Sequence, residues 1–219
     1  MVMKFKFTLF VVAVLSTMTV RAQYSIGGGL STLHGAGVDV NRMGLHAFYE
    51  EPVSNSRTKF YRATIMFPSK NTRQGSIEAV DFSVSPQKIK VDEISKTNLI
   101  SLDGGNRVYF INDYDIGFAL YGALHLKGIL MIKSSDYSNF PSGVSKSDYK
   151  IPQSRSLFSL LASFGANFGA KYQIPGRGAI TADIAGDLIT PMIDQGQVMN
   201  NEISALSITL NFAYRFDFY

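Results

Sequence analysis

The sequence predicts an all-β protein: a closed antiparallel β-barrel that spans a membrane, with short turns on one side and long loops on the other. Three observations predict it. Apolar and polar residues alternate over long segments, short and long connections alternate along the chain, and aromatic residues gather near the segment ends that the short connections join. Membrane barrels show all three features, and their tilted strands need about 9–11 residues to cross a bilayer.

The alternation is clearest in the last segment, residues 206–218. Side chains of a strand point alternately to its two faces, so this segment has one apolar and one polar face. Strands of soluble proteins usually run about 5–6 residues, and the greater length indicates a membrane crossing. The apolar face consists of Leu206, Ile208, Leu210, Phe212, Tyr214, Phe216 and Phe218. The other predicted strands are 24–33, 43–53, 59–67, 100–110, 116–126, 158–172 and 179–188.

The connections between these strands differ in length and composition. Three are short and rich in turn-forming residues, at 54–57, 112–115 and 175–177, and four are longer and polar, at 34–42, 68–95, 133–155 and 190–202. With eight strands the two kinds alternate strictly, as periplasmic turns and external loops do in outer-membrane barrels. Segment 68–95 also alternates locally, which we interpret as an extension of its two flanking strands above the membrane. The alternative is an extra strand pair and a ten-stranded barrel.

Aromatic residues on the apolar faces lie near the ends that the short turns join. Aromatic girdles at the membrane interface are expected of barrels. The predicted girdle consists of Tyr24, Tyr49, Tyr61, Phe110, Phe118, Tyr172 and Phe218.

The N-terminus predicts export. Lys4 and Lys6 precede the apolar run 7–15, and Val20 and Ala22 place small residues before an expected cleavage site at Gln23. The run is shorter than the roughly 20 residues of a membrane-spanning helix, which favours a cleaved signal peptide over an anchor. We therefore expect a signal peptide at residues 1–22 and a barrel domain at residues 23–219.

The composition excludes several classes of protein. The precursor has 21 basic and 17 acidic residues, and removal of Lys4, Lys6 and Arg21 leaves 18 basic residues. The mature chain is therefore almost neutral and has no basic tract of the kind that binds nucleic acid. Cysteine is absent, which excludes disulfides and thiolate metal sites.

Charged residues are predicted to point into the barrel, five of each sign. The lumen of an eight-stranded barrel is about wide enough for side chains to fill it, and buried charges need partners. We interpret the set as a paired plug, and a charged ion pathway is the alternative. The set consists of Glu50, Arg62, Asp103, Arg107, Lys127, Lys171, Asp183, Asp187, Arg215 and Asp217.

No pattern in the sequence predicts catalysis, a metal or a cofactor. By phase His46 and His125 point inward and His34 lies in the first external loop, so none is expected on the outward face near the outer leaflet. The three are too dispersed for a metal site. The glycines 27–29 lie in a strand pattern and precede no helix, which excludes a phosphate-binding loop and favours close backbone approach.

Three segments resemble the small bacterial outer-membrane β-barrel superfamily, which includes the OmpA-, OmpX- and OmpW-like barrels. They are the junction Ala22-Gln23, typical of members from Bacteroidota, the first strand YSIGGGLSTL and the last strand ITLNFAYRFDFY. The resemblance implies an outer-membrane location among lipid and lipopolysaccharide. It also implies a C-terminal aromatic signal for the barrel-insertion machinery, for which Phe216 and Phe218 are in phase and Tyr219 is one residue out of phase.

These observations together predict a non-enzymatic outer-membrane barrel with a structural or binding role. The external loops 68–95 and 133–155 would contact the environment or a partner protein of the cell envelope, because loops on a rigid scaffold commonly carry binding. Two alternatives stay open: a narrow porin-like channel for small solutes and an outer-membrane enzyme that modifies lipid A.

Overall fold

The computed structural model describes residues 24–36, 41–115, 117–151, 156–194 and 203–218. The predicted signal peptide, Ile116 and Tyr219 lie outside the described residues. No helix in the described ranges is long and apolar enough to cross a membrane.

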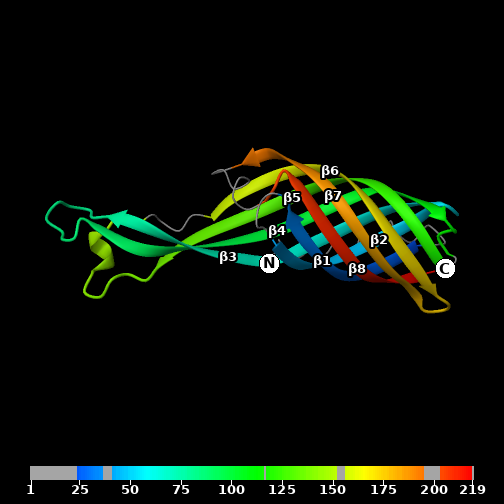
Figure 1. Cartoon of the computed structure of the whole chain (residues 1–219), viewed down its shortest axis with the longest axis horizontal. Coiled ribbons are helices and arrows are strands. Elements are labelled where there is room, and N and C mark those ends of the chain that lie inside the picture. The colour runs from blue at the N-terminus through cyan, green and yellow to red at the C-terminus, as the bar shows by residue number, and fades with distance from the viewer. Residues whose placement is uncertain (1–23, 37–40, 116, 152–155, 195–202, 219) are drawn as a thin grey trace, which may run out of the picture.

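Eight antiparallel strands form a closed ring in chain order (Figure 1). The register between the first and last strands, from Tyr24 opposite Phe218 to Gly35 opposite Ser207, closes the barrel. The eight-stranded prediction is confirmed, and the ten-stranded alternative is wrong. The strands are β1 (Tyr24–Gly35), β2 (Asn41–Ser54), β3 (Arg57–Glu78), β4 (Lys88–Ile111), β5 (Phe118–Ser138), β6 (Ser156–Ile174), β7 (Gly178–Asp194) and β8 (Leu206–Phe218).

The inward and outward faces follow the predicted phase. In β8, Phe212 is 58% exposed on the outside of the barrel, while its neighbours Asn211 and Ala213 are buried. The same alternation runs through β2, β6 and β7. The closed ring gives every strand two partners, which satisfies the backbone hydrogen bonds that a membrane interior cannot satisfy.

The ends of the barrel differ as the connections predict. We call the end with connections 55–56, 112–117 and 175–177 the turn end, and the opposite end the loop end. At the turn end the ring of Tyr24 stacks on Phe218 and Tyr49, with centroid distances of 5.0 and 5.9 Å, and Tyr49 stacks on Tyr61 at 6.4 Å. These outward rings form part of the predicted girdle.

Several strands extend further toward the loop end than predicted. Strand β3 continues to Glu78, β4 begins at Lys88 and β5 continues to Ser138, where the sequence predicted ends at 67, 100 and 126. The added parts of β3 and β4 pair in register beyond a shift between Met66 and Ser69, and β5 pairs with β4 as far as Ser138. Many of their residues are polar, while Ile77, Ile89 and Val91 are buried in an apolar core. Segment 68–95 is therefore an extension of its flanking strands, as expected. The first loop shrinks to 36–40 and is no longer than turn 112–117, so strict length alternation is wrong there.

The extended parts of β3, β4 and β5 form an arm that projects beyond the barrel along its long axis (Figure 1). The arm ends in the connection 79–87, between β3 and β4. The protein thus has two parts, a closed barrel and an external arm.

A charge on the outward face should destabilise the barrel. Phe164, near the middle of β6, is 53% exposed on the outer wall, and Phe164→Arg should cost about 2–4 kcal/mol if that wall faces hydrocarbon. The matched control is Phe82→Arg in connection 79–87, where the side chain is 96% exposed and the change should cost little. The midpoints of urea unfolding in lipid vesicles compare the two variants, and equal shifts would contradict the assigned membrane face.

Candidate functional site

The barrel lumen holds all ten charged residues predicted to point inward. Eight of them are buried, and Lys127 and Asp217 are half-buried. They do not form one line of charges along the lumen, because each sits within a local group of opposite charges and hydrogen-bond donors.

Glu50 is the centre of the first group. Its carboxylate is fully buried and accepts from the guanidinium groups of Arg107 and Arg215, at 3.0 and 3.3 Å. It also accepts from the hydroxyls of Thr58 and Tyr109, at 2.5 and 3.0 Å. Four donors from β3, β4 and β8 therefore converge on a carboxylate of β2, and they tie distant parts of the ring together.

A second group surrounds Asp183. Arg62 forms ion pairs with Asp103 at 2.8 Å and with Asp183 at 3.5 Å. The amide of Asn211 and the hydroxyl of Tyr121 also donate to Asp183, at 2.7 and 3.2 Å. The contacts of Arg62 and Tyr121 with Asp183 cross the lumen from β3 and β5 to β7.

Aromatic side chains, which were not among the predicted charged lumen set, surround the guanidinium of Arg107. It lies 4.5 Å from the ring centre of Tyr121, 4.7 Å from Phe60 and 5.7 Å from Phe48. Cation–π contacts of this kind stabilise a desolvated cation. Gly27 makes room for one ring, because a Cβ there would lie 2.3 Å from Phe48. The position of these rings on the inward face of their strands is the sequence feature that could have predicted their place in the lumen.

Asp187 organises a third group toward the loop end. It accepts from His125 at 2.8 Å and from Ser163 at 2.9 Å, and it pairs with Lys127. Gly165 leaves space for this group, since a Cβ at that position would lie 2.6 Å from both Asp187 and His125.

The turn end of the lumen is filled by Tyr114, which turn 112–117 directs into the barrel mouth. Its ring lies 4.2 Å from the Arg215 guanidinium, and its hydroxyl contacts Ser25. Arg215 pairs with Asp217 at 2.8 Å, and Lys171 donates to the Tyr114 carbonyl. The sequence predicts only a turn at 112–115 and carries no sign of that role.

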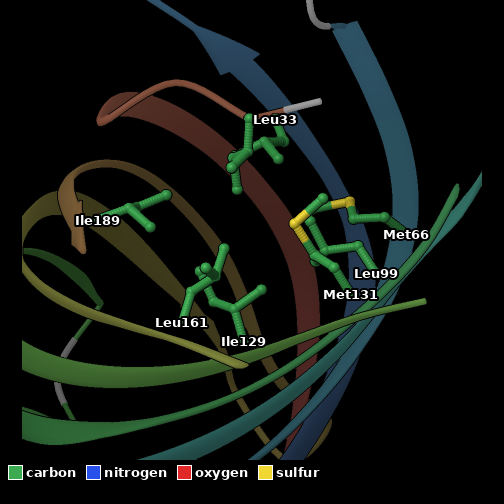
Figure 2. Packing of buried hydrophobic residues seen from close by; sticks show 8 residues of the cluster. Leu33, Met66, Leu99, Ile129, Met131, Leu161 and Ile189 are labelled. Atoms are coloured by element: carbon green, nitrogen blue, oxygen red, sulfur yellow. The ribbon is translucent and has the colours of Figure 1, made fainter. Parts of the chain in front are cut away.

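An apolar layer fills the lumen at the loop end (Figure 2). Its members come from inward positions on six strands and from the segment before β8. At this level of the barrel the inward residues are apolar, so the alternation of apolar and polar residues breaks down. Beneath the layer lies a cavity of about 20 Å³, bordered by Arg62 and Lys127, which is room for about one water molecule. The layer consists of Leu33, Met66, Leu99, Ile129, Met131, Leu161, Ile189 and Ile203.

The histidines do not form a metal site in the described part of the chain, where no group of three metal-binding side chains occurs. His46 contacts the Ser31 hydroxyl at 2.8 Å, and that hydroxyl donates to Asn211 at 2.6 Å, all in the buried lumen. The expectation that His34 lies in a loop is wrong. It belongs to β1, because pairing continues to His34 opposite Asn41 and opposite Ile208.

His34 shares the outward face with Thr32, near the loop end. Its Nε2 lies 3.1 Å from the Thr32 hydroxyl, and its Nδ1 lies 2.6 Å from the Asn41 side-chain oxygen. The Asn41 oxygen is an acceptor, so Nδ1 carries the proton and Nε2 can accept from Thr32. This is the order of hydroxyl, base and orienting group that an activated nucleophile requires.

The aromatic residues at the end of β8 lie on the outward face, as predicted for the assembly signal. Phe216 and Phe218 face outward and are 56% and 44% exposed. Tyr219 lies outside the described residues, and recognition by the insertion machinery stays a prediction.

The arm has an apolar core of its own, separate from the lumen. Connection 139–155 returns from β5 and places Tyr149 against Ile77 and Ile89. Residues 148–150 then pair with the edge of β3 through two backbone bonds, Val80 N–H to the Asp148 carbonyl at 2.8 Å and Lys150 N–H to the Glu78 carbonyl at 2.9 Å. The buried residues of this core are Ile77, Ala79, Ile89, Val91 and Tyr149.

Below that contact one edge of β3 is open. Strand β2 pairs with β3 only as far as Met66, while β4 pairs with it from Ser69 to Glu78. Because Glu78 and Val80 direct their backbone groups to the open side, the even-numbered residues Lys70, Thr72, Gln74 and Ser76 do the same. Such an edge can accept a further strand.

Comparison with known proteins identifies the fold. No family model and no curated protein matches the sequence. Neisserial surface protein A has 10% identity and a TM-score of 0.50, covering 89% of this chain and 96% of that chain. Ail, the attachment invasion locus protein of Yersinia pestis, has 16% identity and a TM-score of 0.46, covering 90% and 100%. The outer membrane protein OprG from Pseudomonas aeruginosa has 9% identity and a TM-score of 0.43, covering 89% and 96%.

The likeness to Neisserial surface protein A shows that the chain has the fold of the small eight-stranded outer-membrane barrels. The resemblance in the sequence is confirmed at that level.

Removal of the Glu50 carboxylate should strongly destabilise the barrel. Glu50→Ala leaves Arg107 and Arg215 buried without their shared partner, and breaking a buried ion pair costs about 3–5 kcal/mol. Glu93→Ala, in the arm part of β4, is the matched control and should change stability little. Urea unfolding in lipid vesicles measures both variants. A Glu50→Ala midpoint as high as that of the control would show that the lumen network does not hold the barrel together.

Proposed function

We propose that this chain, which has the fold of the small outer-membrane barrels, is a non-enzymatic outer-membrane protein whose closed barrel presents the arm to a binding partner outside the cell. The loop end faces the exterior and the turn end the periplasm. The observation that carries the proposal is the arm: it has its own apolar core and projects from a barrel whose lumen is filled.

The lumen supports a structural role rather than conduction. A permeating ion would have to displace Tyr114 at the turn end, pass paired charges and then cross the apolar layer. Apolar constrictions exclude hydrated ions by dewetting, and the cavity beneath the layer has a volume of only about 20 Å³. This arrangement favours a plug over the ion-pathway alternative.

The arm supports a binding role for three reasons. It is built on strands that continue out of the barrel, so it is held rigidly. It carries an open strand edge between Ser69 and Ser76, where an extended segment of a partner can add by backbone hydrogen bonds. It also buries apolar residues in a core separate from the lumen, which supports a defined shape for this part of the chain.

Crosslinking from the arm tests the binding role. A photo-reactive p-benzoylphenylalanine replaces Thr72 at the open edge or Lys90 on β4, and a matched variant carries it at Ser54, at the turn end. Illumination of intact cells should give an adduct with an external or envelope protein from the arm positions. Absence of adducts from both arm positions, with the protein present in the outer membrane, would refute the binding role.

Planar-bilayer recording tests the closed lumen. Purified protein should give no reproducible single-channel steps, because the apolar layer and the paired charges leave no water-filled path. Phe164→Arg protein refolded in parallel reveals leaks that come from damaged barrels. Steady unitary steps from the native chain alone would overturn the plug and favour the porin-like alternative.

A second candidate function rests on the outward trio of Thr32, His34 and Asn41. It lies beside exposed Met43 and Ile208 at the loop end of the apolar wall. In the proposed orientation this end of the wall meets the outer leaflet. The distances suit attack of the Thr32 hydroxyl on an ester carbonyl, with His34 as base. His34 would take the hydroxyl proton and return it to the departing lipid alkoxide while the acyl group passes to Thr32, and water would then release the acyl group as a fatty acid.

Mass spectrometry of lipid A tests this second function. Cells that express the chain should lose one ester-linked acyl chain if the trio is catalytic, and His34→Gln should abolish the loss while Ser31→Ala, in the lumen, retains it. Identical lipid A with and without expression would remove the enzyme from consideration.

A further inference from the structure

The tip of the arm exposes one aromatic side chain almost completely. Phe82, in connection 79–87, is 96% exposed, the highest fraction among the large apolar residues described. Its neighbour Val80 is 55% exposed. Neither belongs to the apolar core of the arm. The ring therefore contributes nothing to the packing of its own chain.

The loop that carries the ring is held rigidly. The side-chain amide of Gln87 donates to the carbonyls of Phe82 and Val84, each at 2.8 Å. The Asp81 carboxylate accepts from the backbone N–H of Ser83 at 3.0 Å, and the Val84 N–H donates to the Asp81 carbonyl at 3.3 Å. Polar backbone groups on both sides of Phe82 are thus satisfied within the loop.

The base of the loop is anchored to the arm core. The hydroxyl of Tyr149, whose ring is buried in that core, donates to the Pro86 carbonyl at 2.8 Å. The Ala79 N–H donates to the Gln87 carbonyl at 2.9 Å and closes the hairpin. A ring presented on such a preformed loop loses little conformational entropy on binding, which is how aromatic anchors at interfaces act.

The surface around the ring is concave and electrically balanced. A cavity of about 230 Å³ lies beside Phe82 and Val80, and its charged border consists of Glu78, Asp81, Lys88 and Lys150. Glu78 and Lys88 form an ion pair at 2.9 Å, and the hydrogen bond and charge from Lys88 lower the pKa of the Glu78 carboxyl. Balanced charge gives no attraction for a polyanion or an anionic membrane.

The apolar surface of Phe82 and Val80 is also too small to bind a membrane stably. Even a complete myristoyl chain gives only marginal, reversible membrane binding, and one phenyl ring with one valine offers less. A protein pocket uses such a ring differently, because a desolvated aromatic anchor at the centre of an interface can dominate its affinity while polar contacts surround it.

We propose that Phe82 is the anchor by which the arm binds a protein partner, with its ring inserted into an apolar pocket of that partner. The polar rim of Asp81, Lys88 and Lys150 surrounds the contact. This inference rests on the proposed binding role of the arm and names the contact point within it.

Site-specific crosslinking at the tip tests the inference. p-Benzoylphenylalanine at position 82 should give one protein adduct in intact cells, at higher yield than the same probe at Lys90. Purified, detergent-solubilised wild-type chain added in excess should suppress the adduct, and Phe82→Ala chain should suppress it at least tenfold less well. Ser83→Ala, which keeps the ring, is the matched competitor and should act like wild type.

The outcomes separate this inference from the function on which it rests. Adducts from Thr72 or Lys90 with none from position 82, or equal competition by wild-type and Phe82→Ala chains, would overturn the anchor and leave the binding role standing. Absence of adducts from every arm position would overturn both. A position-82 adduct made only of lipid, or only of a second copy of this chain, would also contradict the proposed partner.

Discussion

The structure depends on neutralising charge inside a closed ring of eight strands. Closure directs half of every strand into a lumen that is about as wide as its side chains, so each inward charge must find a partner there or stay uncompensated. Glu50 meets this constraint for two guanidinium groups at once, because Arg107 and Arg215 both donate to its carboxylate. Those residues belong to β2, β4 and β8. The ion pairs therefore fix how non-neighbouring strands face one another, in addition to neutralising the charge.

The filled barrel and the arm have different proposed roles. In the proposed function the wall holds the protein in the bilayer, the charged groups and the apolar layer seal the lumen, and the arm carries the groups that a partner contacts. The regular register of β3 with β4 from Ser69 to Glu78 connects the two parts without a flexible linker. A surface loop on such a support is preorganised for binding, as Phe82 at its tip illustrates.

Much of the barrel was predictable because its physics is local. The alternation in β8, from Leu206 to Phe218, follows from one face meeting lipid and the other the lumen, and its phase held at every residue. The inward position of Glu50, Arg62 and Asp183 follows from the same rule. The pairing of particular charges could not be predicted from this rule, because only the shear and closure of the sheet bring Arg62 and Asp183 together.

Other features could not be predicted from the sequence because they depend on tertiary structure. The sequence predicted a loop from residue 133, where β5 continues to Ser138, because the residues there are polar and show no apolar period. The extension of β3 and β4 was predictable from the local alternation within segment 68–95. Tyr114 looks like a turn residue and fills the barrel mouth because Arg215 lies beneath it. His34 looked like a loop residue and extends β1, because its pairing with Ile208 of β8 appears only when the ring closes.

Accessibility of the lumen to a thiol reagent tests the sealed barrel most directly. The chain has no cysteine, so single-cysteine variants report one site each. Ser207 borders the cavity beneath the apolar layer, is 0% exposed, and its hydroxyl has no hydrogen-bond partner among the described residues, so Ser207→Cys should preserve the fold. Ser76→Cys, on the exposed edge of the arm, is the control. In lipid vesicles a methanethiosulfonate reagent should label the arm cysteine at once and the lumen cysteine only after unfolding. Labelling of Ser207→Cys in the folded protein as rapid as that of the arm would contradict a sealed lumen.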